Sequence, residues 1–100
     1  MNQDVQPGFM VKSKAGRDKG KHFMVYSTDG GEFVTLVDGV LRKQASPKKK
    51  RVKHMEPTGV ELTNLSQKLR EGTHLFDAEI RKALEEAGYG NKASSMKKEG

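Results

Sequence analysis

The sequence predicts a mainly β fold: a small β-barrel, then a short α-helical C-terminal extension and a disordered tail. Short apolar runs separated by glycine-containing turns fill the first half, a pattern typical of small barrels. Apolar residues recur at helical spacing in the second half. Of the 100 residues, 33% are hydrophobic and 32% charged, which limits the chain to one domain with a modest core.

Three segments rich in β-branched and aromatic residues predict the first three strands, at residues 8–13, 21–27 and 32–37. A turn at 29–31 separates the second from the third. The expected interior residues are Phe9, Val11, Phe23, Val25, Phe33 and Val37. Apolar residues also occupy Met10, Met24, Val34 and Leu36, and a curled barrel tolerates apolar side chains on both faces.

Asp38 and Gly39 predict the next turn, a type I′ hairpin that requires positive φ at both central residues. We therefore expect a fourth strand from Val40 to Lys43. Val52 and Met55 are the apolar positions at which a short closing strand would lie.

Two helices are predicted after the barrel. The first has a capping box at Thr58–Glu61 and Gly72 as C-cap, with Leu62, Leu65 and Leu69 on one face. The second covers 77–87. Its expected features are Asp77 as N-cap, Phe76 as a hydrophobic staple, Ile80 and Leu84 on one face and Gly88 at the end. The expected units are thus a barrel at 1–56, a helical extension at 57–88 and a disordered tail at 89–100.

A basic loop lies between the first two predicted strands. Gly16 and Gly20 allow the chain to turn sharply, and Arg17, Lys19 and Lys21 place positive charge at the tip. We expect Asp18 to be a turn former that orients Arg17 and Lys19. Such a loop suits a phosphate-bearing partner.

Charge is distributed unevenly along the chain. The formal net charge is +6, and residues 1–54 hold 12 Lys and Arg against 5 Asp and Glu, a net +7. The remaining residues carry a net −1. Lys and Arg gain affinity for polyanions by releasing condensed counterions, so the barrel half is expected to bind nucleic acid.

Several residues of the first half match a known family pattern. They are Gly8, Val11, Ser13, the run 16–21, Phe23, Val25, the run 37–39, the run 41–43 and the run 47–50. On these residues the chain resembles the KOW-domain RNA-binding proteins, similar to archaeal and eukaryotic-type large-subunit ribosomal proteins. The resemblance covers about the first half of the chain. It implies a Src-homology-3-like barrel that binds structured ribosomal RNA.

We expect RNA phosphates to be contacted by the basic segments of the barrel half. The candidate residues are Lys14, Arg17, Lys19, Lys21, Arg42, Lys43, Lys48, Lys49, Lys50, Arg51 and Lys53. Gly16, Gly20, Asp38 and Gly39 are expected to be structural turn residues. Residues 48–53 have two other interpretations, a solvated linker or part of a nuclear-localisation signal beginning at Pro47. Tyr26 is either a core residue or a platform on which an unpaired base stacks.

Other classes of function receive less support. The chain has no cysteine, so it forms neither disulfides nor thiolate metal sites. His22, His54 and His74 are scattered singly, and no catalytic constellation stands out, so we expect no enzyme, metal or cofactor. Without a membrane-spanning run or a signal peptide, the expectation is a cytoplasmic protein, monomeric when free. The alternative is a protein-interaction barrel that docks on RNA polymerase or ribosomal proteins.

Overall fold

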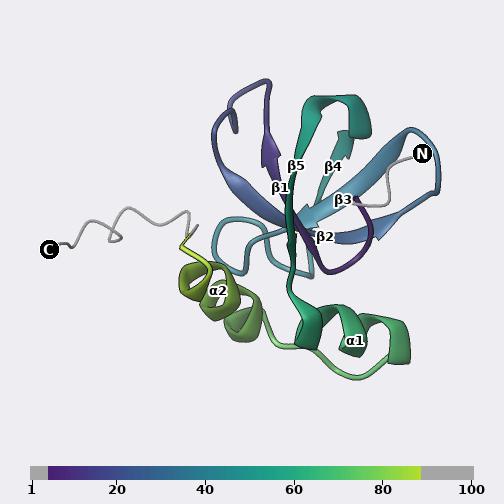
Figure 1. The fold of residues 1–100 in the computed structure, drawn as a ribbon, viewed down its shortest axis with the longest axis vertical. Coiled ribbons are helices and arrows are strands. Elements are labelled where there is room, and N and C mark those ends of the chain that lie inside the picture. Colours follow the sequence, from purple (N-terminus) through teal and green to yellow (C-terminus); the bar gives the residue numbers. More distant parts are fainter. Residues whose placement is uncertain (1–4, 89–100) are drawn as a thin grey trace, which may run out of the picture.

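The computed structural model describes residues 5–88, which form an antiparallel sheet and two α-helices (Figure 1). The strands are β1 (Phe9–Ser13), β2 (His22–Thr28), β3 (Phe33–Val37), β4 (Lys48–Arg51) and β5 (Met55–Glu61). A short 3₁₀ helix, η1 (Val52–His54), joins β4 to β5, and the helices are α1 (Thr63–Glu71) and α2 (Asp77–Glu86). The class is therefore mainly β. The tail expected at 89–100 lies outside the described residues.

The five strands form one sheet in the order β4-β3-β2-β1-β5, and every neighbouring pair is antiparallel. Register shifts in the β1–β5 and β2–β3 pairs interrupt the ladder. Such irregularities increase the local twist and bend of a sheet. β4 and β5 are the two edge strands and do not pair with each other, so the sheet is open.

The first three predicted strands are confirmed, but the fourth is wrong. Residues 40–43 form no strand, because Asp38 folds this segment back on itself. Asp38 Oδ1 accepts hydrogen bonds from the backbone N–H groups of Val40 and Arg42, both at 2.8 Å. The expected type I′ turn is also wrong. That turn requires positive φ at both Asp38 and Gly39, but only Gly39 has it, since no non-glycine residue between 5 and 88 has positive φ.

The partner of β3 is instead the basic strand β4, in which Lys48 pairs with Leu36 and Arg51 with Phe33. Residues 48–51 are therefore not a linker. Lysine on an edge strand also discourages pairing with other chains. The last strand, β5, contains Pro57 opposite Val11. Proline is tolerated there because β5 is an edge strand.

Alternate strand residues pack on two separate cores. The inner core lies within the curve of the sheet and consists of Val5, Val11, Phe23, Val25, Val34, Leu36 and Met55. The second lies between the sheet and the helices and consists of Met10, Met24, Val37, Leu65, Leu75, Ile80 and Leu84. Apolar residues occupy both faces of the sheet because the helices cover the second face. Tyr26 packs against this helix-side core.

Three of the expected interior residues lie elsewhere. Phe9 and Phe33 are only partly buried and belong to neither core. Successive residues of a strand point to opposite faces. Val34 and Leu36 point into the inner core, so Phe33, which is one position from Val34 and three from Leu36, points outward. Val37 is fully buried, but it packs beneath the helices on the opposite side of the sheet.

The helices differ from expectation mainly at their starts. Thr58 is in β5, where its hydroxyl donates to Met10 O at 3.0 Å, so the capping box expected there is wrong. The expected unit boundary after residue 56 accordingly falls inside β5. Gly72 is the left-handed C-cap of α1, as predicted. Asp77 is the first residue of α2 and not its N-cap, while Phe76 is 60% exposed and forms no buried staple.

Candidate nucleic-acid interface

The β1–β2 loop, residues 14–21, is a tight backbone turn. Gly20 N–H donates to Ser13 O at 2.8 Å, and Ser13 N–H donates to Lys21 O at 2.9 Å. Gly20 has φ +89°, a conformation that side-chain-bearing residues rarely adopt. Arg17 and Lys19 are exposed between these bonds, so the turn presents both cations to solvent.

Asp18 is buried within this loop, with 7% of its surface exposed. Its carboxylate lies 3.9 Å from Lys21 Nζ, and its backbone carbonyl accepts from Lys21 N–H at 2.9 Å. The structure thus pairs Asp18 with Lys21, whereas the sequence pointed to Arg17 and Lys19. This ion pair partly neutralises Lys21.

β4 and η1 bring further cations to the loop. A Cβ at Gly16 would lie 3.3 Å from Lys50 Nζ, which places the Lys50 ammonium against the turn. Lys14 N–H donates to His54 O at 2.8 Å, so η1, which carries Lys53, is fixed beside the loop. We call this group the loop face, and it consists of Lys14, Arg17, Lys19, Lys21, Lys50 and Lys53.

Two of the other three cations of β4, Lys49 and Arg51, lie on the outer face of the sheet, and the third, Lys48, pairs with Leu36 at the start of the strand. Lys49 Nζ is 4.6 Å and Arg51 Cζ is 5.0 Å from the centre of the Phe33 ring. Arg51 Nη1 also lies 3.4 Å from Glu32 Oε2 on the exposed surface. Sequence reasoning assigned Phe33 to the core. Thr35, its polar outward neighbour on β3, was the signal that this face meets water.

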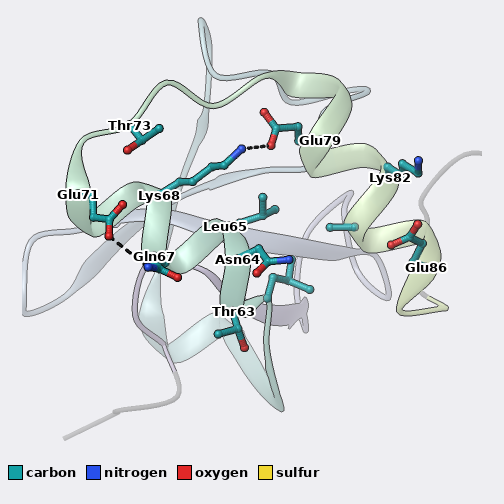
Figure 2. A pocket seen from close by; sticks show the side chains of 12 residues that line it. Thr63, Asn64, Leu65, Gln67, Lys68, Glu71, Thr73, Glu79, Lys82 and Glu86 are labelled. Atoms are coloured by element: carbon teal, nitrogen blue, oxygen red, sulfur yellow. Dashed lines mark hydrogen bonds and ion pairs between the residues drawn. The ribbon is translucent and has the colours of Figure 1, made fainter.

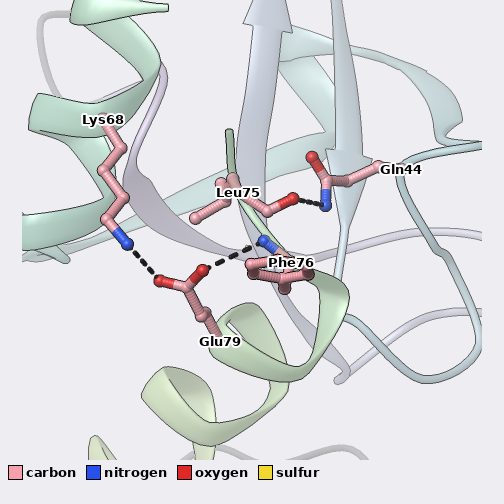
Figure 3. Close-up of polar contacts among 5 residues, drawn as sticks. All are labelled: Gln44, Lys68, Leu75, Phe76 and Glu79. Atoms are coloured by element: carbon pink, nitrogen blue, oxygen red, sulfur yellow. Dashed lines mark hydrogen bonds and ion pairs between the residues drawn. The ribbon is translucent and has the colours of Figure 1, made fainter. Parts of the chain in front are cut away.

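Arg42 and Lys43 are held at the helix end of the sheet, whereas the β1–β2 loop projects away from the helices (Figure 1). Their segment is docked by the next residue, Gln44. Its Nε2 donates to Leu75 O at 2.6 Å (Figure 3). Its backbone N–H donates to Asp77 Oδ1 at 2.9 Å. The structure therefore does not bring Arg42 and Lys43 to the loop face.

A groove of about 710 Å³ lies between α1 and α2 (Figure 2). Lys68 Nζ meets Glu79 Oε1 across it at 2.5 Å, and Glu79 Oε2 accepts from Phe76 N–H at 3.1 Å (Figure 3). Hydrogen bonds from Lys68 and Phe76 hold the pKa of Glu79 below its usual range. Lys82, Glu71 and Glu86 also line the groove, so its charge is mixed and does not favour a polyanion.

Residues 5–88 contain no group of three His, Asp or Glu able to hold a metal ion. His22 sits at the start of β2, opposite Lys12. Burial is the main cause that lowers the pKa of His22, the Lys12 charge adds to it, and Glu56 acts in the opposite direction.

Comparison with models of known protein families and with curated proteins finds no match to this chain. Neither helix of the described part is long and apolar enough to cross a membrane.

Proposed function

We propose that this protein binds RNA, in particular structured ribosomal RNA, and that its sheet is a KOW-type Src-homology-3-like barrel left open between the edge strands β4 and β5. The loop face contacts phosphates. The observation that carries the proposal is the approach of Lys50 Nζ to Gly16, because it joins the basic strand and the basic loop into one surface. The net charge of +7 over residues 1–54 agrees with a polyanionic partner.

Phosphate contacts position the protein on RNA without reading its sequence. In this proposal the protein is cytoplasmic and ribosome-associated, is a monomer when it is not bound to RNA, and catalyses no reaction. Arg42 and Lys43 contribute through long-range charge only, since their loop is docked at the helix end of the sheet.

The test replaces Arg17, Lys19 and Lys50 together by alanine and measures affinity for a 20-nucleotide RNA hairpin over a series of salt concentrations. All three residues belong to the loop face, and none is in the inner core. We expect weaker binding, with the slope of log affinity against log salt falling by about 0.7–0.9 for each phosphate that the variant no longer neutralises.

The matched control removes Arg70, Arg81 and Lys82 from the helices, which subtracts the same charge from the other side of the molecule. It should bind RNA nearly as well as the unaltered protein. Equal losses of affinity in the two triple variants would mean that only net charge matters, and the proposed loop face would then be wrong. Sucrose gradients at low and high salt test ribosome association directly.

A second candidate function is docking on a protein such as RNA polymerase or a ribosomal protein. Leu41 is 58% and Phe76 60% exposed, and both residues are in segments at the helix end of the sheet. Replacing both by serine would abolish capture of such a partner while leaving the affinity for the RNA hairpin unchanged.

A further inference from the structure

Phe33 is an aromatic ring on an open part of the sheet. Its β3 neighbour Val37 points to the same face and is covered by the helices, but Phe33 is only partly buried and packs in neither core. Lys49 Nζ lies 4.6 Å and Arg51 Cζ lies 5.0 Å from the centre of its ring. Both cations lie over the ring. Proteins that bind single-stranded nucleic acid combine aromatic rings, on which bases stack, with cations that contact the backbone.

A shallow pocket of about 200 Å³ adjoins the ring and is lined by Ser27, Asp29, Thr35 and Lys49 among others. Its volume is below the roughly 300–1,000 Å³ of pockets for drug-sized ligands, so it suits one planar ring better than a whole nucleotide. Ser27 Oγ and Thr35 Oγ1 are hydrogen-bonded to each other at 2.6 Å on its surface.

Asp29 decides which part of a nucleotide fits this pocket. Its Oδ1 accepts from Gly31 N–H at 2.7 Å and Phe33 N–H at 3.2 Å, which fixes the carboxylate at the tip of the β2–β3 hairpin. These bonds lower the pKa of Asp29, so it is anionic at neutral pH. A carboxylate repels phosphate and accepts hydrogen bonds from N–H groups. The pocket therefore suits a base, while the phosphates next to it suit Lys49 and Arg51.

We propose that this pocket binds one unpaired base of the RNA, stacked on Phe33 and hydrogen-bonded to Asp29, with guanine preferred. Guanine presents two adjacent donors, N1–H and N2–H, to a carboxylate. Lys49 and Arg51 are long, flexible side chains, and they leave the ring for the flanking phosphates when the base stacks. The inference rests on the proposed function, because it supplies base recognition to a protein that otherwise contacts phosphates.

The experiment measures binding of RNA heptamers, seven uridines or the same sequence with a central guanine, by full-length protein over a salt series. Phe33→Leu keeps an apolar side chain but removes the stacking face. We expect at least about fivefold weaker binding of the guanine heptamer with an unchanged salt slope, since no charge is removed. Phe76→Leu is the matched control, because Phe76 is exposed but away from the sheet face, and it should bind like the unaltered protein.

Asp29→Asn tests the base preference, because asparagine retains the Oδ1 acceptor for the hairpin and loses the charge. The unaltered protein should prefer the guanine heptamer, and Asp29→Asn should lose that preference. If Phe33→Leu does not fold, as judged by circular dichroism, two measurements replace it: binding by Phe33→Tyr, which keeps the ring and should retain affinity, and amide shifts of Ser27 and Thr35 during RNA titration.

Three outcomes would overturn the base pocket while leaving RNA binding in place: normal affinity of Phe33→Leu, a reduced salt slope in that variant, or amide shifts absent from Ser27 and Thr35. A reduced slope would mean that Phe33 positions the two cations and does not stack a base. Absence of a guanine preference would overturn the role of Asp29. If the unaltered protein bound neither the heptamers nor the RNA hairpin at low salt, the proposed function itself would fail.

Discussion

At the scale of single residues, the direction of a side chain decides whether it stabilises the fold or meets a ligand. Val34 and Phe33 are adjacent and both apolar, yet Val34 is 1% exposed and Phe33 lies on the open face. Successive strand residues point to opposite faces, so only one of the two can join the inner core, and Phe33 lies where the other face is not fully covered. Composition alone could not show which one. The pairing of Phe33 with Arg51, which no local pattern encodes, places it among cations.

His22 makes stability depend on pH in a defined window. Burial and the Lys12 charge lower its pKa in the folded protein below the value of about 6.5 expected for the unfolded chain. Between these two values the unfolded state binds more protons, so stability falls as pH falls. The stabilising contribution of neutral His22 is complete above about pH 6.5, and it is lost as pH falls through the lowered pKa.

We therefore expect the free energy of unfolding to fall as pH falls below about 6.5, and to fall less in His22→Gln. Urea denaturation at several pH values measures the difference between the two proteins. The carboxylates with lowered pKa, Asp29 and Glu79, lose their contributions only at more acidic pH, since their ordinary values are near 4. Equal pH dependence of the two proteins across this window would contradict the assignment to His22.

At the scale of elements, the sequence predicted what local pattern determines and missed what pairing determines. β1, β2 and β3 are apolar runs with turn residues between them, so their positions follow from the sequence. β4 is a run of cations with low strand propensity, and it is a strand because its backbone pairs with β3. β5 contains Pro57 and Gly59, which argue against a strand, yet it pairs with β1 along the sheet edge.

The candidate site divides in the same way. The loop at 14–21 was predictable because glycine spacing and charge are local features. The approach of Lys50 to that loop and the exposure of Phe33 depend on strand order and register, which the sequence analysis did not determine. A resemblance to a family can supply a fold, but these two features come from the structure.

The docking of residues 38–47 on α2 gives a prediction at this scale. Gly39 has φ +79°, and a Cβ there would overlap the backbone of α2 at Asp77 O and Arg81 N. Gly30 has the same φ but open space around it. Both changes to alanine strain the backbone, whereas only Gly39→Ala also pushes the loop off the helix.

We expect Gly30→Ala to destabilise the protein by about 1 kcal/mol and Gly39→Ala by at least about 2 kcal/mol more. The reason is that the Gly39 loop and the backbone of α2 are packed together, and neither can move without losing contacts. Denaturant unfolding of the two variants measures this difference. Similar destabilisation of both variants would show that the loop can leave α2 without cost, and that the Gln44 hydrogen bonds do not hold it there.

At the scale of the whole molecule, the helix-covered core and the proposed RNA-binding loop face lie toward opposite ends of the sheet. The helices cover Met10, Met24 and Val37, and the loop face projects from the opposite end of the sheet (Figure 1). All of the excess positive charge lies on the strand half, while the helices carry mixed charge. We therefore expect the helical segment to be required for the strand half to fold, and to supply little of the proposed attraction for RNA.

A fragment ending at Leu62 tests this division, because it keeps all five strands and removes both helices. It uncovers Met10, Met24 and Val37, which are each fully buried in the complete chain. Burial of such a side chain stabilises by about 1.5–3 kcal/mol, so the three together account for about 5–9 kcal/mol. That range is comparable to the whole stability of a small domain, about 5–15 kcal/mol.

We expect the amide NMR signals of the fragment to show the narrow dispersion of an unfolded chain, and polar replacement of the three residues to restore part of the dispersion. A well-dispersed spectrum from the unaltered fragment would mean that the strands fold alone, and the helices would then have to serve a partner instead of the core.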